Sequence, residues 1–64
     1  MSPILRYFEC ARLPEKLRAV SAPICDLAAD VDSSLPDGAE KSAGLRKLLE
    51  AKDCFVRAAL DGAK

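Results

Sequence analysis

Hydrophobic residues recur with a helical period along most of the chain, and the longest such run covers residues 44–60. With successive residues about 100° apart around a helix, one face of this run is apolar and another is charged. The apolar face consists of Leu45, Leu48, Leu49, Phe55, Val56, Ala59 and Leu60, and the charged face of Arg46, Glu50, Asp53 and Arg57. The pattern predicts a helix over residues 39–60, and Gly62 is a typical stop signal just beyond it.

A second apolar stripe predicts a kinked helix over residues 14–33. Its members recur at steps of three and four and are Leu17, Val20, Ile24, Leu27, Ala28, Val31 and Leu35. Pro14 suits the first turn of a helix, whereas Pro23 lies inside the pattern, where proline removes one backbone hydrogen bond and clashes with the preceding turn. We therefore expect one helix with a kink near residues 19–23; two helices separated at residues 21–22 are the alternative.

The N-terminal residues predict a short helix over residues 3–10. Pro3 is favourable at a first helical position, and Ser2 is able to cap the helix. Because a helix of this length is not stable by itself, it must dock on the rest of the chain, and Tyr7 and Phe8 are its docking groups.

Clustered serine, proline, aspartate and glycine residues at 33–38 predict the turn between the two long helices. Either Asp37 or Ser42 can cap the helix that follows. The predicted architecture is therefore all-α: a single domain over residues 1–64, in which a short N-terminal helix precedes an antiparallel helical hairpin. The apolar face of the last helix spans about 140°, which is wider than one partner helix covers, so we expect a homo-oligomer.

The formal charge is zero, from ten basic and ten acidic residues, which argues against a DNA or RNA polymer as the partner. No apolar run is long enough to span a membrane. Arg6 and Glu9 interrupt the only apolar stretch near the N-terminus, so that stretch does not resemble a signal peptide. We therefore expect a soluble, intracellular protein.

The three cysteines, Cys10, Cys25 and Cys54, are widely spaced, and the sequence has no histidine and no CxxC pair. These features argue against a zinc site and predict three reduced cysteines in a cytoplasmic protein. Without histidine, Ser–His and Cys–His pairs are impossible, and the isolated Gly38 and Gly44 do not form a phosphate-binding loop. We therefore expect no metal, no cofactor and no enzymatic activity.

Lys52 is the most informative candidate residue, because it lies close to the centre of the apolar face of the last helix. Either its stem packs on apolar neighbours while its ammonium reaches water or an acid of another chain, or it lies at the floor of a pocket between subunits and faces a phosphate. Arg46 and Arg57 also have two interpretations. They form exposed ion pairs with Glu50 and Asp53 at i,i+4 spacing, or they reach across a subunit interface to an anion.

Five further residues have both a structural and a binding interpretation. Tyr7 and Phe8 either pack in a core or an interface, or they provide a surface on which a nucleobase stacks. Lys16 and Arg18 are exposed charges unless an anion lies near the start of their helix. Ser21 either hydrogen-bonds back to its own helix or binds a ligand.

Three segments of the chain resemble a group of small phage proteins. They are residues 13–21 (LPEKLRAVS), 35–37 (LPD) and, above all, 40–53 (EKSAGLRKLLEAKD). The group contains the helical hairpin domain shared by the phage anti-CBASS cyclic-oligonucleotide sponges, and the resemblance covers about residues 13–60. It implies a compact helical homo-oligomer, typically a hexamer. Such a protein binds cyclic dinucleotides, and often cyclic trinucleotides in a second type of pocket, without cleaving them.

In such sponges an aromatic residue near the N-terminus and a basic residue at the start of the first long helix bind the dinucleotide. The resemblance assigns these roles to Tyr7 and to Arg18, with Lys16 as the alternative. The polar and arginine residues of the trinucleotide pocket would correspond to Ser21, Arg46 or Arg57.

We therefore expect a protein that sequesters cyclic di- and trinucleotide second messengers in the cytoplasm of the infected bacterial host and so antagonises CBASS immunity. The hairpin domain also occurs in phage proteins of unproven activity. The alternative is accordingly a phage helical protein-interaction or assembly module with no nucleotide ligand. A DNA-binding accessory protein is the least favoured interpretation, because the net charge is zero.

Overall fold

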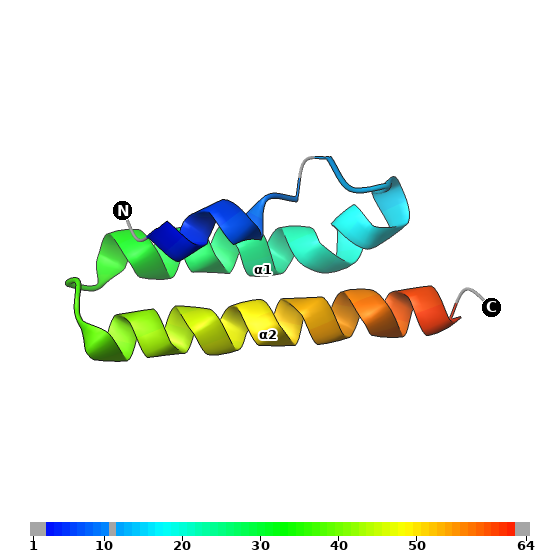
Figure 1. Ribbon diagram of the computed structural model, residues 1–64. Helices are drawn as coiled ribbons and strands as arrows, with labels where there is room; N and C mark the ends of the chain where they lie inside the picture. The colour runs from blue at the N-terminus through cyan, green and yellow to red at the C-terminus, as the bar shows by residue number, and fades with distance from the viewer. Residues whose placement is uncertain (1–2, 11, 63–64) are drawn as a thin grey trace.

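The computed structural model describes residues 3–10 and 12–62, and this part of the chain is helical without any strand. It contains a 3-10 helix η1 (Pro3–Phe8) and two α-helices, α1 (Glu15–Ser34) and α2 (Ala39–Gly62). In Figure 1, α1 and α2 lie side by side and antiparallel. Helix η1 lies along α1 and is antiparallel to it. The predicted all-α fold, a short helix followed by a helical hairpin, is confirmed.

Helix α1 runs without interruption through Pro23, so the alternative of two helices separated at residues 21–22 is wrong. Pro23 is exposed, and so is Ala19, the residue whose carbonyl group has no amide donor at Pro23. Pro14 occupies the N-cap position, one residue before the first turn where it was expected, and its carbonyl oxygen accepts a hydrogen bond from the Arg18 amide at 2.8 Å.

Helix η1 ends at Phe8, two residues earlier than expected, and it is a 3-10 helix, as is common for short helical segments. The predicted cap, Ser2, lies outside the described residues. Phe8 is the docking group that was expected: it is 7% exposed and is part of the core. Tyr7, the other expected docking group, remains 52% exposed.

The core lies where the three helices meet, and each helix contributes one of its buried residues. These residues are Phe8 from η1, Ala28 from α1 and Leu45 from α2. Partly buried side chains surround them: Ile4, Leu5, Ile24, Cys25, Val31, Leu48 and Leu49. The short helix therefore closes the seam of the hairpin.

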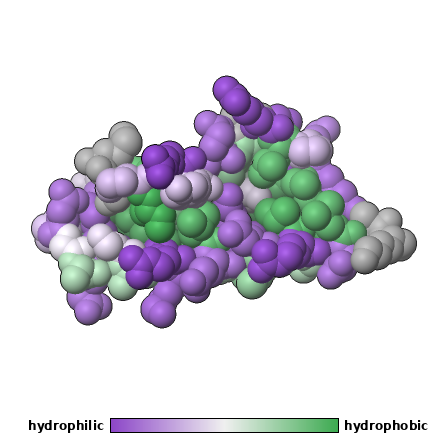
Figure 2. Space-filling model, in the orientation of Figure 1, coloured by the Kyte–Doolittle hydropathy of each residue, from purple (hydrophilic) through white to green (hydrophobic). Residues whose placement is uncertain are grey.

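Several apolar residues remain about half exposed in the single chain. They are Tyr7, Leu27, Leu35, Phe55 and Leu60. Figure 2 shows two green apolar regions on one face of the molecule, separated by a purple polar band. One helix pair and a 3-10 helix therefore do not cover all of the apolar surface that the sequence provides.

A buried lysine closes the turn between α1 and α2. Lys41 Nζ donates to the carbonyl oxygens of Asp32, at 2.9 Å, and Leu35, at 3.1 Å, at the C-terminal end of α1. It also donates to Asp37 Oδ1 at 2.6 Å and lies 3.2 Å from Asp32 Oδ1. A helix leaves its last carbonyl groups without intrahelical partners, and an ammonium group is a favourable partner for them.

The prediction of Ser42 as the cap of the last helix is wrong, because α2 begins three residues earlier, at Ala39. The Ser42 amide instead donates to the carbonyl oxygen of Gly38 at 3.0 Å, as expected inside a first helical turn. The side chain of the other candidate, Asp37, accepts its hydrogen bond from Lys41.

Candidate functional site

Tyr7 and Arg6 together form an exposed aromatic and cationic surface on η1. The Tyr7 ring is on the outside of the molecule, and Arg6 Nη2 donates to its hydroxyl group at 2.9 Å. The guanidinium carbon of Arg6 lies 4.9 Å from the ring centroid, within the range of a cation–π contact. The pair therefore offers a flat ring for stacking and a planar cation for an anionic group at the same place.

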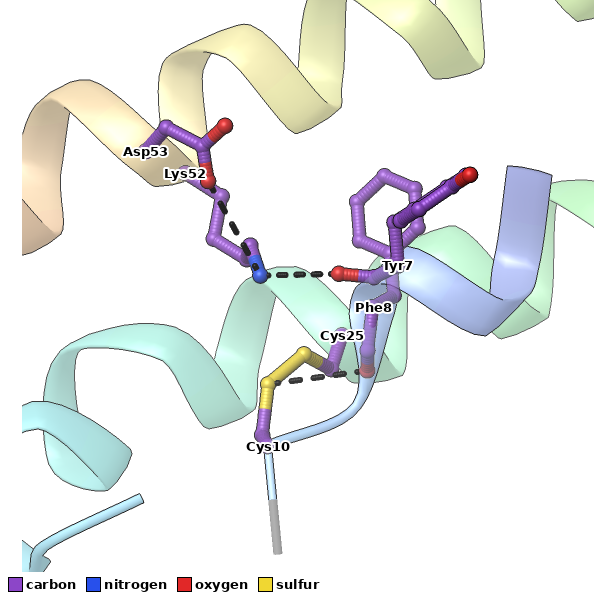
Figure 3. The surroundings of a disulfide bond; sticks show 6 residues. All are labelled: Tyr7, Phe8, Cys10, Cys25, Lys52 and Asp53. Atoms are coloured by element: carbon purple, nitrogen blue, oxygen red, sulfur yellow. Dashed lines mark hydrogen bonds and ion pairs between the residues drawn. A yellow bond between two sulfur atoms is a disulfide. The ribbon is translucent and has the colours of Figure 1, made fainter. Parts of the chain in front are cut away.

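Lys52 of α2 holds this surface in position. Its Nζ atom donates to the backbone carbonyl oxygen of Tyr7 at 2.9 Å and lies 5.9 Å from the centroid of the Phe8 ring. Asp53 Oδ1 is 4.0 Å away, and Figure 3 shows the ammonium group between this carboxylate and the Tyr7 carbonyl. Because Lys52 is only 8% exposed, its ammonium group makes its contacts within the chain.

Neither sequence interpretation of Lys52 anticipated this contact. Both directed the ammonium group outward, to water, to an acid of another chain or to a phosphate between subunits. Lys52 and Tyr7 are 45 residues apart, and only the folding of η1 back over the hairpin brings them together. The position of Lys52 in the apolar stripe did indicate a contact of this kind, because a buried ammonium group requires a hydrogen-bond or ion-pair partner.

The prediction of three reduced cysteines is wrong for two of them, because Cys10 and Cys25 form a disulfide. The Cα atoms are 6.7 Å apart, and the bond joins the end of the η1 segment to α1 (Figure 3). The two cysteines are 15 positions apart in the sequence. The chain reverses direction between them, so their separation in the sequence does not predict the distance between them in space. Cys54 is free and exposed.

The remaining predicted cations are exposed in the single chain. They are Lys16, Arg18, Arg46 and Arg57. Within the described residues, the expected ion pairs of Arg46 with Glu50 and of Arg57 with Asp53 do not form. Asp53 pairs with Lys52 instead, and Arg57 Nη2 donates to Cys54 Sγ at 3.3 Å.

Ser21 is completely buried, so its side chain is inaccessible to a ligand in this conformation of the chain. Its hydroxyl oxygen has no hydrogen-bond partner in the described part of the chain, so the expected hydrogen bond back to its own helix is not present. Phe8 and Lys52 are the other buried members of the predicted set, and Phe8 packs in the core. The structure thus brings together Tyr7, Phe8 and Lys52 and leaves the other predicted residues apart from them.

Lys41 and Asp37 form the most perturbed titratable pair, and sequence reasoning missed their role. The hydrogen bond from Lys41, and then its positive charge, lowers the pKa of Asp37 below the ordinary value of 3.8. The hydrogen bond to Asp37 in turn raises the pKa of Lys41, against the opposing effect of burial. The i,i+4 spacing of the two residues was the available signal.

No pocket is present in the single chain within residues 3–10 and 12–62. The same part of the chain contains no group of three side chains able to hold a metal ion. None of its helices has the length and apolar character needed to cross a lipid bilayer. A small ligand would therefore lie against an exposed surface such as that of Tyr7 and Arg6, or between copies of the chain.

Fold and site together define a small helical hairpin protein with an anchored aromatic surface. No protein-family model, curated protein or solved structure matches the chain.

Proposed function

We propose that this protein binds and sequesters cyclic di- and trinucleotide second messengers without cleaving them, and so antagonises CBASS immunity in the infected bacterial cell. The observation that carries the proposal is the exposed ring of Tyr7, beside the Arg6 guanidinium group and anchored through its backbone by Lys52. The resemblance of residues 13–60 to the phage sponges supports the same ligand class.

The chemistry of this surface suits a cyclic oligonucleotide. A nucleobase stacked on an aromatic ring contributes about 1–3 kcal/mol, and a guanidinium group pairs with phosphate in a planar, bidentate geometry. Such a compact ligand carries only a few phosphates, so a small number of local cations is sufficient and a net charge of zero is compatible with binding.

A single chain supplies only one side of such a site. The further cations that the proposal requires are Lys16, Arg18, Arg46 and Arg57, all of them exposed and available to a ligand held between copies. We therefore include a homo-oligomer, a hexamer by resemblance, in the proposal. Phe8 and Lys52 contribute to the position of the surface, and Ser21 is buried inside the chain. We do not include the side chains of these three residues among the groups that contact the ligand.

Titration calorimetry with a panel of cyclic di- and trinucleotides tests the proposal. We expect at least one member to bind and to be recovered intact after the protein is denatured. Tyr7→Phe retains the ring and should retain most of the affinity, whereas Tyr7→Ala should lose the stacking contribution, about a factor of 5 to 150. Absence of binding across the whole panel at tens of micromolar would refute the proposal.

A second candidate function is a protein-interaction or assembly module, and the half-exposed Phe55 and Leu60 at the end of α2 favour it. A contiguous patch of exposed apolar side chains commonly marks a partner surface, and these two residues would be part of it. This candidate predicts that Phe55→Glu abolishes capture of a host or phage protein from lysate while nucleotides have no effect. The sponge requires no protein partner.

A further inference from the structure

The Cys10–Cys25 disulfide is attached to the chain three residues beyond Tyr7. Cys10 follows η1 by two residues, and the bond fixes this end of the segment to α1. The other attachments of the same segment are the packing of Phe8, Ile4 and Leu5 in and around the core, and the Lys52 hydrogen bond to the Tyr7 carbonyl. The disulfide is the covalent one among them, and Figure 3 shows it on the same short segment as the other two.

We propose that Cys10 and Cys25 form a redox-sensitive tether that controls how firmly η1, and with it Tyr7, is held against the hairpin. In the disulfide form the segment is fixed at three points. In the dithiol form it is held only by the non-covalent contacts, which are the Lys52 hydrogen bond and the apolar packing of Phe8, Ile4 and Leu5. A 3-10 helix of six residues has little stability of its own.

The geometry accommodates both states of the cysteine pair. Cys10 Sγ lies 3.6 Å from the carbonyl oxygen of Phe8. A disulfide sulfur has no proton to donate, but the thiol of reduced Cys10 would donate a weak hydrogen bond to this oxygen. Opening the disulfide therefore leaves the buried Cys10 with a polar partner already in place. Ala28 and Leu45, the core residues of the hairpin, lie on α1 and α2 and are not themselves part of the bond.

The redox step is an ordinary exchange with a dithiol reductant. A thiolate of the reductant attacks Cys25, the more exposed of the two half-cystines, to form a mixed disulfide, and Cys10 leaves as a thiolate that takes up a proton. The second thiol of the reductant then attacks its own sulfur in the mixed disulfide and releases Cys25, which is also protonated. The reductant becomes a disulfide, and two electrons and two protons pass to the protein.

The size of the effect follows from the length of the closed loop. A disulfide that closes a loop of about 15 residues lowers the conformational entropy of the unfolded chain. The effect changes the equilibrium constant between the folded and unfolded states by roughly a hundredfold. Applied to η1, reduction should raise the population of the undocked segment by roughly ten- to a hundredfold while the hairpin stays folded.

The sequence provides a local probe for this test. Tyr7 is the only tyrosine and the chain has no tryptophan, so intrinsic fluorescence reports on η1 alone. We would use a Cys54→Ser background to remove the free thiol, and compare the air-oxidised protein with the same protein in dithiothreitol. The readouts are thiol titration, acrylamide quenching of Tyr7 and amide hydrogen exchange over residues 3–10, with the α1 amides around Ala28 as the internal control.

We expect no titratable thiol in the oxidised protein and two in the reduced protein. Reduction should increase quenching of Tyr7 and speed exchange in residues 3–10, and leave exchange around Ala28 unchanged. The double variant Cys10→Ser, Cys25→Ser should behave as the reduced protein and be insensitive to the dithiol. Two free thiols after oxidation would overturn the proposal, as would unchanged quenching or loss of the whole hairpin on reduction.

The effect of the tether on ligand affinity rests on the proposed function, whereas the effect on Tyr7 does not. A cyclic nucleotide that binds the oxidised protein should bind the reduced protein more weakly, because part of the binding energy is used to order η1. Equal affinity in both states would remove this regulatory role. Since quenching and exchange require no nucleotide, a failure of the tether is distinguishable from a failure of nucleotide binding.

Discussion

Replacement of Lys52 by methionine tests the central structural claim, that a buried ammonium group on α2 holds η1 in place. Methionine retains an unbranched apolar stem and removes only the charged donor. The carbonyl oxygen of Tyr7 then loses the hydrogen bond that it accepts at 2.9 Å. Because this contact joins the two elements directly, its loss should act on the docking of η1 before it acts on the hairpin.

The magnitude follows from three contacts of the ammonium group. A hydrogen bond from a charged donor contributes about 1.5–3 kcal/mol. The Asp53 carboxylate is 4.0 Å away on a half-exposed side chain and adds about 0–0.5 kcal/mol. The Phe8 ring, at 5.9 Å, lies at the outer limit of a cation–π contact and adds about 0.5 kcal/mol. Release of a buried charge offsets part of this sum, so we expect a loss of about 2 kcal/mol in η1 docking, or about thirtyfold.

Tyr7 fluorescence quenching and hydrogen exchange over residues 3–10 measure this loss, and urea unfolding followed by circular dichroism measures the stability of the hairpin. Lys47→Met is the matched control, because Lys47 is exposed on the same helix. The change should be larger in the dithiol form than in the disulfide form, since the covalent bond keeps the segment close even after it undocks. Wild-type quenching in Lys52→Met would show that the lysine does not hold η1, and global unfolding would show that the contact supports the core instead.

Three further predictions concern the hairpin itself. Ser21→Ala should raise the melting temperature, by a change equivalent to about 1 kcal/mol or more, because it removes a buried hydroxyl group that has no partner; a lower melting temperature would show that the hydroxyl is satisfied. Leu45→Ala should lower the free energy of unfolding by about 2–5 kcal/mol in urea titrations, because the side chain is 1% exposed at the contact of all three helices; a loss no greater than that of an exposed leucine would contradict this. Asp37→Asn should lower the melting temperature at neutral pH. Since the pKa of Asp37 in the folded protein lies below 3.8, its contribution to stability is complete above pH 3.8 and disappears as the pH falls through the folded pKa. The melting temperatures of wild type and variant should therefore converge in strong acid. A difference in melting temperature that stays constant with pH would refute the assignment.

The two long helices could be predicted closely from the sequence. The expected ranges 14–33 and 39–60 differ from α1 and α2 by two residues or fewer at each end. Long amphipathic stripes determine helices of this kind because the period is repeated over five or more turns. Pro23 is exposed and does not divide the helix, and the expected kink near residues 19–23 stays a prediction.

The candidate site could be predicted only in part, because its contacts join residues that are distant in the sequence. The aromatic character of Tyr7 and the unusual position of Lys52 were both recognisable. Their connection through a backbone carbonyl was not, and neither was the Cys10–Cys25 pairing. Both depend on where a six-residue 3-10 helix docks, and so short an element has too few turns for its own pattern to decide that.

The way in which η1 is anchored bears on the role of Tyr7. Lys52 contacts the backbone of Tyr7, the disulfide follows three residues later, and Phe8 supplies the buried ring, so none of the three attachments uses the Tyr7 side chain. The fold therefore does not require an aromatic residue at position 7, and a smaller side chain there would expose less apolar surface. Because the backbone that carries the ring is fixed before binding, less conformational entropy is lost when a ligand stacks on the ring, which is the property that a recognition surface needs. Tyr7→Ala should accordingly leave the free energy of unfolding within about 0.5 kcal/mol of wild type while it weakens nucleotide binding by about a factor of 5 to 150. A strongly destabilised variant would show instead that the ring serves the fold.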